Sequence, residues 1–423
     1  MKIAVIGGGS SYTPELLDGL LARAADLDLQ EVVLHDVDPN RLALVTGFVQ
    51  RMAKARKKAL AISSTRKLGA AVRGAAYVIA QIRVGGNRAR MEDEKLGLRH
   101  GLIGQETTGV GGFAKALRTI PAMLEIAEVI ASESPMAVLI NFTNPSGLVT
   151  EALLNHSQVQ AIGLCNIPVT FHLELAKALG ARRDEVELDY VGLNHLAWVR
   201  GVRLRGQEVI EEVLAWAGSA DQPATLATLD YPKNFLRALH MIPMPYLRYY
   251  YRTEKMLAEL RARPKTRAEE VREIETELMK IYADPSACEK PDLLSRRGGA
   301  HYSLAALELI EAIHFNRGER QVLNVKNQGV LPALAEAAVI EVPCRVTKDG
   351  AKPLPLLPPE PIILGLIQTV KAYEELTIQA AVEKNYDQAL LALVAHPLGP
   401  EVDQAETVLD DIITTHGIKL EKN

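Results

Sequence analysis

Cys165 and His195 are the two residues whose types and spacing say most about the chemistry of this chain. Cys165 begins the tetrapeptide Cys-Asn-Ile-Pro, and His195, thirty residues later, ends the tetrapeptide Gly-Leu-Asn-His. Structural zinc takes four protein ligands, usually in close pairs, so one cysteine and one distant histidine make a poor zinc site. The same two ligands suit an open divalent metal site that leaves coordination positions for a substrate.

A glycine-rich loop follows the first predicted strand and leads into a predicted helix. It consists of Gly7, Gly8, Gly9, Ser10, Ser11 and Tyr12. Glycines allow close approach to a pyrophosphate, and a helix N-terminus favours its negative charge. Asp36 follows the second predicted strand, where a carboxylate can accept a hydrogen bond from a ribose hydroxyl. Tyr12 replaces the third glycine of the usual fingerprint and Asp36 lies later than usual, but the position of the loop predicts a dinucleotide site rather than a plain tight turn.

The composition is that of an ordinary globular protein. The 423 residues are 48% hydrophobic and 24% charged, and the formal net charge is −4, so neither nucleic acid nor a membrane is an expected partner. Three cysteines are too few for a disulfide framework and favour a reducing compartment. The sequence has no signal-peptide pattern and no apolar window of membrane-spanning length, which predicts a cytoplasmic protein.

Alternating strand and helix patterns predict an α/β fold over the first part of the chain. Short apolar runs are separated by segments of helical period, which indicates a Rossmann-like doubly wound parallel sheet over residues 1–168. The runs are Ile3–Ile6, Val32–Leu34, Tyr77–Ile82, Ala137–Ile140 and Ala161–Leu164. The helical segments are Pro14–Ala25, Arg41–Leu60, Ala114–Ala131 and Ser146–Asn155.

The pattern changes in the second part of the chain. Glu187–Leu204 alternates and is rich in β-branched residues, which predicts antiparallel strands. Long helical stretches follow at Ala268–Tyr282, Leu304–Asn316 and Ile363–Lys384. We expect residues 169–423 to form a mixed α+β domain for substrate, metal and oligomerisation, with the site in the cleft between the two domains.

Several motifs together resemble glycoside hydrolase family 4, the NAD- and metal-dependent glycosidases. Their order and spacing agree with the family over nearly the whole chain, whereas each motif alone is weak. They are the glycine loop with Thr13–Glu15, Ile82–Gly86, Gly104–Thr107, Asn141–Pro145, Cys165–Pro168, Gly192–His195, Tyr246–Tyr251 and Arg297–Ser303. Within the family, the cysteine, tyrosine and Arg-Gly-Gly motifs look most like the 6-phospho-β-glucosidase branch.

The resemblance implies elimination followed by addition at the sugar. In this chemistry NAD takes a hydride from C3, a base removes the C2 proton, the aglycone leaves from C1, water adds and the hydride returns, with no net redox change. The resemblance implies that Cys165 and His195 hold Mn²⁺ or another divalent metal and that Tyr246 is the base. It also implies that Arg83 joins the glycine loop and Asp36 in binding the cofactor.

The resemblance further implies a phosphorylated disaccharide or a phosphorylated β-glucoside as the small-molecule substrate. Arg90, Asn144, Asn166 and Arg267 would bind it. The α-selective phosphoglucosidases of the family carry an aspartate where this chain has Asn166, so the leaving-group acid is unassigned here. Glu106 would lie near the site as a reacting or an orienting group. The family also suggests a homodimer or a homotetramer.

Other interpretations stay open from the sequence. Cys165 could be a small buried residue, His195 a core histidine, Tyr246 a packing residue, and the arginines solvated surface groups. The chain could act on unphosphorylated or α-linked sugars as an α-glucosidase, α-galactosidase or galacturonidase. A 2-hydroxy-acid dehydrogenase would share the doubly wound fold, but a metal-binding pair such as Cys165 and His195 is not expected in that class of enzyme. A non-catalytic nucleotide-binding regulator is a further alternative.

Overall fold

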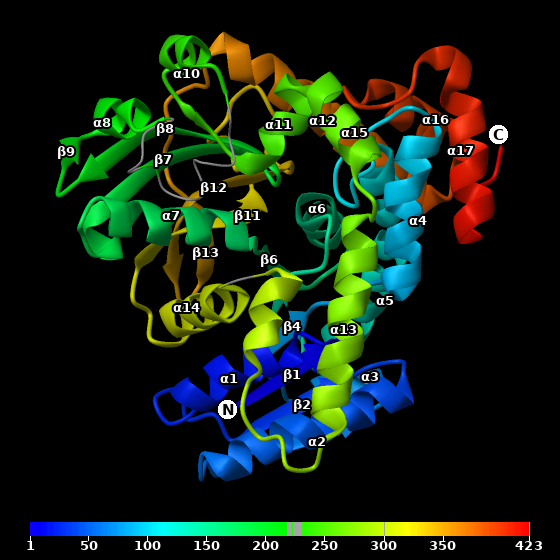
Figure 1. Cartoon of the computed structure of the whole chain (residues 1–423). Coiled ribbons are helices and arrows are strands. Elements are labelled where there is room, and N and C mark those ends of the chain that lie inside the picture. The colour runs from blue at the N-terminus through cyan, green and yellow to red at the C-terminus, as the bar shows by residue number, and fades with distance from the viewer. Residues whose placement is uncertain (218–221, 223–230, 300, 423) are drawn as a thin grey trace.

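The computed structural model describes residues 1–217, 222, 231–299 and 301–422. Ala300, in the Arg-Gly-Gly motif, lies outside this part of the chain. The described elements form a large mixed sheet with helices on its faces, beside which a smaller antiparallel sheet stands with its own helices (Figure 1). The predicted α/β fold is confirmed.

Six parallel strands form the first part of the large sheet. Their spatial order is β6-β5-β4-β1-β2-β3, the arrangement of a doubly wound dinucleotide fold. The strands are β1 (Lys2–Ile6), β2 (Glu31–His35), β3 (Ala61–Thr65), β4 (Tyr77–Ala80), β5 (Val138–Asn141) and β6 (Gln160–Gly163). Their helices are α1 (Thr13–Arg23), α2 (Pro39–Ala55), α3 (Leu68–Val72), α4 (Gly86–Arg99), α5 (Gly109–Glu133) and α6 (Ser146–His156).

Three antiparallel strands from late in the chain extend the same sheet beyond β6. They are β11 (Glu319–Lys326), β12 (Val339–Thr347) and β13 (Gly350–Pro353). The smaller sheet contains β7 (Val186–Leu193), β8 (Leu196–Leu204), β9 (Gln207–Glu208) and β10 (Ile242–Pro243). The antiparallel strands predicted over Glu187–Leu204 are therefore confirmed as β7 and β8.

The remaining helices surround the two sheets. They are α7 (Asn166–Ala178), α8 (Ile210–Ala215), α10 (Lys233–Leu239), α11 (Arg248–Tyr251), α12 (Thr253–Ala262), α13 (Arg267–Ala283), α14 (Tyr302–His314), α15 (Pro361–Glu383), α16 (Tyr386–Ala395) and α17 (Val402–His416). Short 3-10 turns lie at η1 (Arg183–Glu185), η2 (Pro245–Leu247) and η3 (Asp292–Arg297). The predicted division after residue 168 falls inside α7, and the two-domain division stays a prediction.

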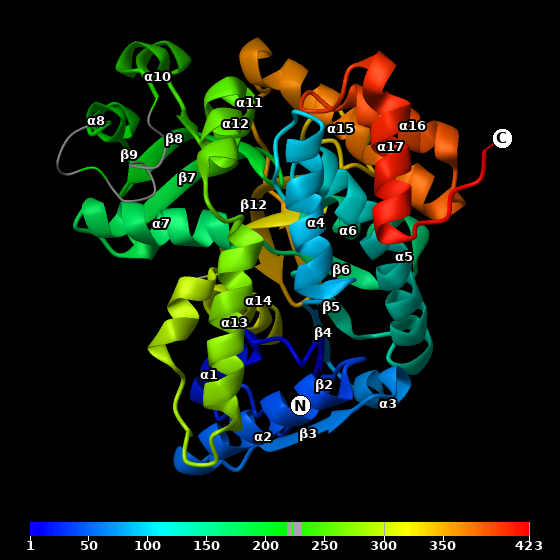
Figure 2. The ribbon, with the colours of Figure 1, turned by 45° about the vertical axis from the view of Figure 1, so that its right-hand side comes forward.

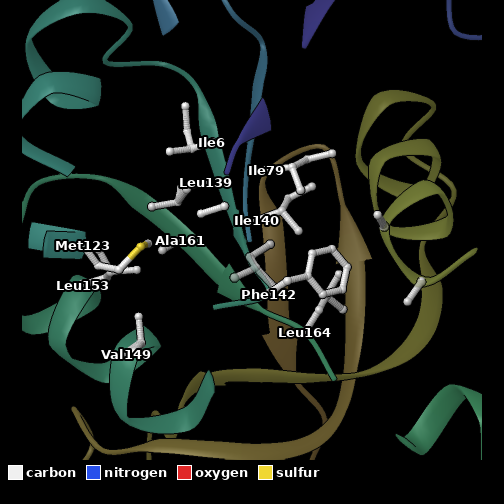
Figure 3. Close-up of a cluster of buried hydrophobic side chains, with 14 of the residues drawn as sticks. Ile6, Ile79, Met123, Leu139, Ile140, Phe142, Val149, Leu153, Ala161 and Leu164 are labelled. Carbon is white, nitrogen blue, oxygen red and sulfur yellow. The ribbon is translucent and has the colours of Figure 1, made fainter. Parts of the chain in front are cut away.

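The core lies between the parallel strands and the helices that cover them. Ile6, Ile79 and Leu139 from three neighbouring strands, with Met123 of α5 and Leu153 of α6, belong to one apolar cluster (Figure 3). Complete burial of such side chains contributes about 1.5–3 kcal/mol each. This core holds the carboxyl ends of the strands in fixed positions, which is where ligands bind in such sheets.

α13 is the helix that connects the two halves of the molecule. It packs against α2 and α4 of the first half and against η3 of the second (Figures 1 and 2). At the α2 end, the Tyr282 hydroxyl donates to the carbonyl of Ser11, and Arg51 donates to the carbonyl of Tyr282. At the other end, the backbone N–H of Ala268 donates to Glu94 in α4.

A membrane span requires a helix of sufficient length and apolar character. Within residues 1–217, 231–299 and 301–422, every helix is too short or too polar to cross a bilayer.

Candidate active site

A cavity of about 1210 Å³ lies at the carboxyl ends of the parallel strands and reaches residues of the second half. Twelve of the residues singled out from the sequence line it: Gly7, Gly9, Ser10, Tyr12, Asp36, Arg83, Arg90, Asn144, Asn166, His195, Tyr246 and Arg267. The structure therefore brings these residues to one cavity, and their roles stay predictions. Gly8, Ser11 and Cys165 are not among the lining residues.

The glycine loop turns sharply between β1 and α1. Gly7 adopts a positive φ of 85°, and a Cβ there would lie 2.8 Å from the carbonyl oxygen of Gln81. A Cβ at Gly9 would lie 2.9 Å from an oxygen of Asp36. Side chains are therefore excluded from a loop that stands at the N-terminus of α1, which is the arrangement that a dinucleotide pyrophosphate requires.

Asp36 supports this loop as well as facing the cavity. Its Oδ2 accepts from the backbone N–H of Gly9 at 2.9 Å, and its Oδ1 accepts from the N–H of Asp38 at 3.0 Å. Each carboxylate oxygen keeps a second lone pair, so Asp36 can still accept from a ribose hydroxyl.

Gly8 and Ser11 face inward, for two different reasons. The N–H of Gly8 donates to the carbonyl of His35, and a Cβ would lie 2.7 Å from the Cβ of Leu34. Ser11 is fully buried, and its hydroxyl donates to Glu275 of α13 at 2.6 Å. Both residues shape the loop from behind the cavity.

Cys165 stands immediately before α7, and backbone amides point at its sulfur. The N–H groups of Asn166 and Ile167 and the side-chain amide of Asn194 all hydrogen-bond to this sulfur. Burial and the nearby Glu341 carboxylate nevertheless raise the pKa of the Cys165 thiol. Donors at a helix N-terminus favour a thiolate, and a bound cation would supply the remaining stabilisation.

His195 lies in the turn between β7 and β8 with a positive φ of 66°. Burial and the charge of Lys115 lower its pKa to about 3, so the imidazole is neutral. Its Nδ1 is buried without a hydrogen-bond partner among the described residues. A neutral imidazole with an unused ring nitrogen is the form of histidine that ligates metals.

Tyr246 packs directly on this histidine. The two rings are parallel within 4°, with their centroids 3.9 Å apart. Burial, with Tyr249, Cys165 and Glu106 acting in the same direction, raises the pKa of the Tyr246 phenol. The three residues predicted to hold the metal and to remove the proton therefore form one cluster, although they lie up to 81 positions apart in the sequence.

These residues fit a divalent metal. A buried thiol with backbone amides aimed at it and a neutral histidine with an orphaned nitrogen are the donors available, and both suit Mn²⁺ and neighbouring transition metals. In the described part of the chain, no three His, Cys, Asp or Glu side chains gather closely enough to hold a metal alone. The donors available therefore match an open site rather than a closed structural one.

A second polar cluster in the cavity is strongly charged. Glu106 forms ion pairs with Arg83, with Arg90 at 3.1 Å and with Lys115 at 2.7 Å. Arg90 also pairs with Glu94 at 3.0 Å. Although burial alone would raise the pKa of Glu106, these three cations hold it well below its usual range. Arg83 and Arg90 are thus fixed side chains and not solvated surface groups.

Arg267 and the two asparagines also reach the cavity, each with support. Arg267 pairs with Glu270 at 2.9 Å and donates to the carbonyls of Arg296 and Arg297. Asn144 hydrogen-bonds to Tyr302, and Asn166 lies at the start of α7. Part of the hydrogen-bonding capacity of Arg267 is therefore used to hold the Arg-Gly-Gly segment.

The sequence reasoning gave no role to Glu275, Arg297 or Glu341. Glu275 accepts from Ser11 and Asn87 and pairs with Arg297, while Glu341 accepts from Tyr190, Asn194 and Asn324. One signal could have revealed Glu275. Glu275 lies on the same face of α13 as a stripe of buried residues at helical spacing. The buried residues of this stripe are Ala268, Val271, Leu278 and Tyr282.

Comparison with known proteins agrees with this geometry. The family model described as family 4 glycosyl hydrolase matches residues 2–181, and that of the family 4 C-terminal domain matches residues 190–399. The chain belongs to glycosyl hydrolase family 4. The resemblance inferred from the motifs is confirmed.

Two curated relatives match this family 4 chain over almost its whole length. A probable 6-phospho-β-glucosidase of Bacillus subtilis is 40% identical over 98% of this chain and 96% of its own length. A 6-phospho-β-glucosidase of Thermotoga maritima is 41% identical over 98% of both chains.

Solved structures give the same picture. The Thermotoga maritima enzyme with NAD and glucose-6-phosphate is 40% identical, with a TM-score of 0.92 and full coverage of both chains. A further structure of that enzyme contains manganese, NAD⁺ and glucose-6-phosphate. A malate dehydrogenase of Plasmodium falciparum is 13% identical with a TM-score of 0.54, which shows only a shared fold.

Proposed function

We propose that this chain hydrolyses 6-phospho-β-glucosides and uses NAD and a divalent metal, Mn²⁺ in the first instance. The observation that carries the proposal is the 40% and 41% identity, over 98% of the chain, to curated 6-phospho-β-glucosidases. The cavity supports it, because the glycine loop, the Cys165–His195 pair and Tyr246 meet there or directly behind its wall.

NAD would lie over the glycine loop, with Asp36 accepting from its ribose and Arg83 beside it. Cys165 and His195 would hold the metal, whose remaining positions are left for the sugar. When bound, the nicotinamide supplies a hydride acceptor and the metal supplies a Lewis acid.

Tyr246 is the proposed base that removes the C2 proton. Its ring is held in place by stacking on His195, and Thr107 hydrogen-bonds to its hydroxyl. Burial raises the pKa of this phenol, whereas a cation beside the ring would favour the phenolate. The same cation that activates the sugar would therefore also prepare the base.

Arg90, Arg267, Asn144 and Asn166 are the proposed substrate-binding residues. A guanidinium suits a phosphate because it offers two parallel donors, and Arg90 is oriented by Glu94 and Glu106. The asparagines would hydrogen-bond to sugar hydroxyls or to the phosphate. An asparagine is no proton donor to a leaving group, so Asn166 leaves that role to another group or to solvent.

A panel of chromogenic substrates tests the proposed function. The purified chain with NAD⁺ and Mn²⁺ should cleave 4-nitrophenyl 6-phospho-β-glucoside and leave both the unphosphorylated β-glucoside and the 6-phospho-α-glucoside largely intact. Preferred cleavage of a free or an α-linked sugar would overturn the assignment in favour of another activity of the family. Stoichiometric accumulation of NADH would favour a dehydrogenase.

We also infer a cytoplasmic homodimer or homotetramer. Helices α15, α16 and α17 lie together at one end of the molecule (Figure 1). Four of their large apolar side chains are exposed: Ile362, Leu391, Val394 and Val402. Light scattering after size exclusion should give two or four times the 46.2 kDa of the chain. A mass of one chain at micromolar concentration would contradict this inference.

A further inference from the structure

Arg297 is a further arginine that lines the cavity. It ends η3, lines the cavity, and its guanidinium carbon lies 5.5 Å from the ring centre of Tyr12, the last residue of the glycine loop. Its side chain is 18% exposed. It therefore stands where the cofactor loop meets the segment that precedes α14.

The guanidinium is only partly satisfied by the protein. Among the described residues its one ion-pair partner is Glu275, at 3.2 Å, and its Nε is buried without a hydrogen-bond partner. Burial and the charges of Arg83 and Arg90 lower its pKa. A largely buried cation with an unused donor and like-charged neighbours is costly unless an anion joins it.

The surroundings carry more positive than negative charge. In the ion pairs of this part of the cavity, five cationic side chains share three carboxylates. The cations are Arg41, Arg83, Arg90, Lys115 and Arg297, and the carboxylates are Glu94, Glu106 and Glu275. An anionic ligand would balance this excess.

Neighbouring residues hold Arg297 in its position. Glu275 accepts hydrogen bonds from Ser11 at 2.6 Å and from Asn87 at 2.8 Å, and these hold its carboxylate in one position beside Arg297. Arg267 donates to the carbonyl of Arg297 at 3.3 Å. Gly299, with a φ of 82°, leaves no room for a side chain, because a Cβ would lie 2.8 Å from Tyr302.

We propose that Arg297 is a further anion-binding residue of this site, which donates to a phosphate oxygen of a bound ligand. The phosphate belongs either to the dinucleotide or to the 6-phosphate of the sugar. The choice of these two ligands rests on the proposed function. The position and contacts of Arg297 are independent of that function.

Ligand affinity, rather than turnover, tests the proposal. Isothermal titration calorimetry on the full chain would measure NAD⁺ and, separately, glucose-6-phosphate, for wild type, Arg297→Gln and Arg297→Lys. Loss of a charge-assisted hydrogen bond should weaken one of the two ligands by about tenfold or more in Arg297→Gln. The ligand that weakens identifies the source of the phosphate. Arg297→Lys keeps the positive charge but loses the paired donors of the guanidinium, so the affinity for the same ligand should fall by about threefold to tenfold.

Arg296→Gln is the matched control, because Arg296 is the exposed neighbour and does not line the cavity. Its affinities should equal those of wild type. The proposal would be overturned if Arg297→Gln and Arg297→Lys bound both ligands with affinities within about twofold of wild type. A lower melting temperature with unchanged affinities would describe an arginine that only stabilises the fold. If Arg297→Gln does not fold, Arg297→Lys alone decides.

The outcome is separable from that of the proposed function. A wild-type chain that binds both ligands but cleaves no 6-phospho-β-glucoside would contradict the activity and leave Arg297 testable. A chain that cleaves this substrate while Arg297→Gln binds normally would contradict only the role of Arg297. A wild-type chain that binds neither ligand would count against both.

Discussion

The two polar clusters of the cavity differ in how the protein treats charge. Around Cys165, His195 and Tyr246, burial drives side chains toward their neutral forms: it raises the pKa of the thiol and the phenol and lowers that of the imidazole to about 3. Around Glu106 and Glu275, arginines outweigh the effect of burial and hold the pKa of both carboxylates below the usual range.

This difference separates two tasks. Neutral donors with an unused lone pair or a removable proton suit metal ligation and proton transfer, and they change state when a cation arrives. Permanently charged arginines fixed by carboxylates suit the positioning of phosphates, which stay charged throughout. We infer that one cluster performs the chemistry and the other holds the ligands, and this inference predicts different defects for variants of each cluster.

Replacement of Tyr246 by phenylalanine should have the largest effect. It removes the proposed base but keeps the ring on His195, so kcat should fall by about 10²–10⁴ while the affinity for NAD⁺ stays unchanged. Tyr251→Phe is the control, because the Tyr251 hydroxyl accepts from Trp198 and Tyr251 is not among the residues that line the cavity. Wild-type kcat for Tyr246→Phe would remove this residue from the mechanism.

Replacement of Glu106 by glutamine should instead destabilise the fold. Arg83, Arg90 and Lys115 would lose the charge that they share, and the free energy of unfolding should fall by about 3 kcal/mol. Urea denaturation would measure this against Glu92→Gln, whose partner Arg99 is half-exposed and whose cost should stay under about 1 kcal/mol. Equal losses of unfolding free energy in both variants would show that the ion pairs of Glu106 stabilise the fold no more than an exposed ion pair does.

Replacement of Cys165 by serine should affect the metal and not the nucleotide. A hydroxyl is a much poorer ligand than a thiolate, so the affinity for Mn²⁺ should fall by about tenfold or more. Paramagnetic resonance of free Mn²⁺ reports this without any turnover, with Cys288→Ser as the control. Unchanged Mn²⁺ binding in Cys165→Ser, or weakened NAD⁺ binding, would break the proposed separation of tasks.

A smaller, pH-dependent effect is expected at the buried Lys371. Glu374 and Glu151 share the buried Lys371, and burial raises the pKa of Glu374 to about 7. The folded chain then holds an extra proton between about pH 4.5 and 7, so the free energy of unfolding falls as pH rises through that window. Glu374→Gln cannot titrate at this position, so its free energy of unfolding in urea should decline less than that of wild type over this range. Parallel pH profiles would contradict the raised pKa.

Local pattern was enough to predict the sheet wherever strands are apolar. The five apolar runs correspond to β1, β2, β4, β5 and β6, although the run at Tyr77–Ile82 ends as a strand at Ala80. β3 was missed because Ala61–Thr65 is a polar strand at the sheet edge with only Ile62 buried. β11–β13 were missed because their place beside β6 depends on pairing between residues far apart in the chain.

The same limit applies to the site. Residues inside recognisable motifs, such as Cys165, His195 and Tyr246, could be predicted and do come together. The buried stripe of α13 marks Glu275 as an inward-facing carboxylate, but it could not reveal the partner Ser11, which is 264 residues away. The family resemblance predicted that Arg267 binds the substrate, but it could not show that Arg267 also donates to the backbone carbonyl of Arg297.

Hydrolysis of a 6-phospho-β-glucoside in D₂O, with NAD⁺ and Mn²⁺, tests the central claim most directly. If Tyr246 removes the C2 proton and solvent later returns one, nuclear magnetic resonance of the glucose-6-phosphate product should show deuterium at C2. The Tyr246→Phe protein should form this product far more slowly. Wild-type product that carries only hydrogen at C2 would contradict the proposed role of the neutral cluster.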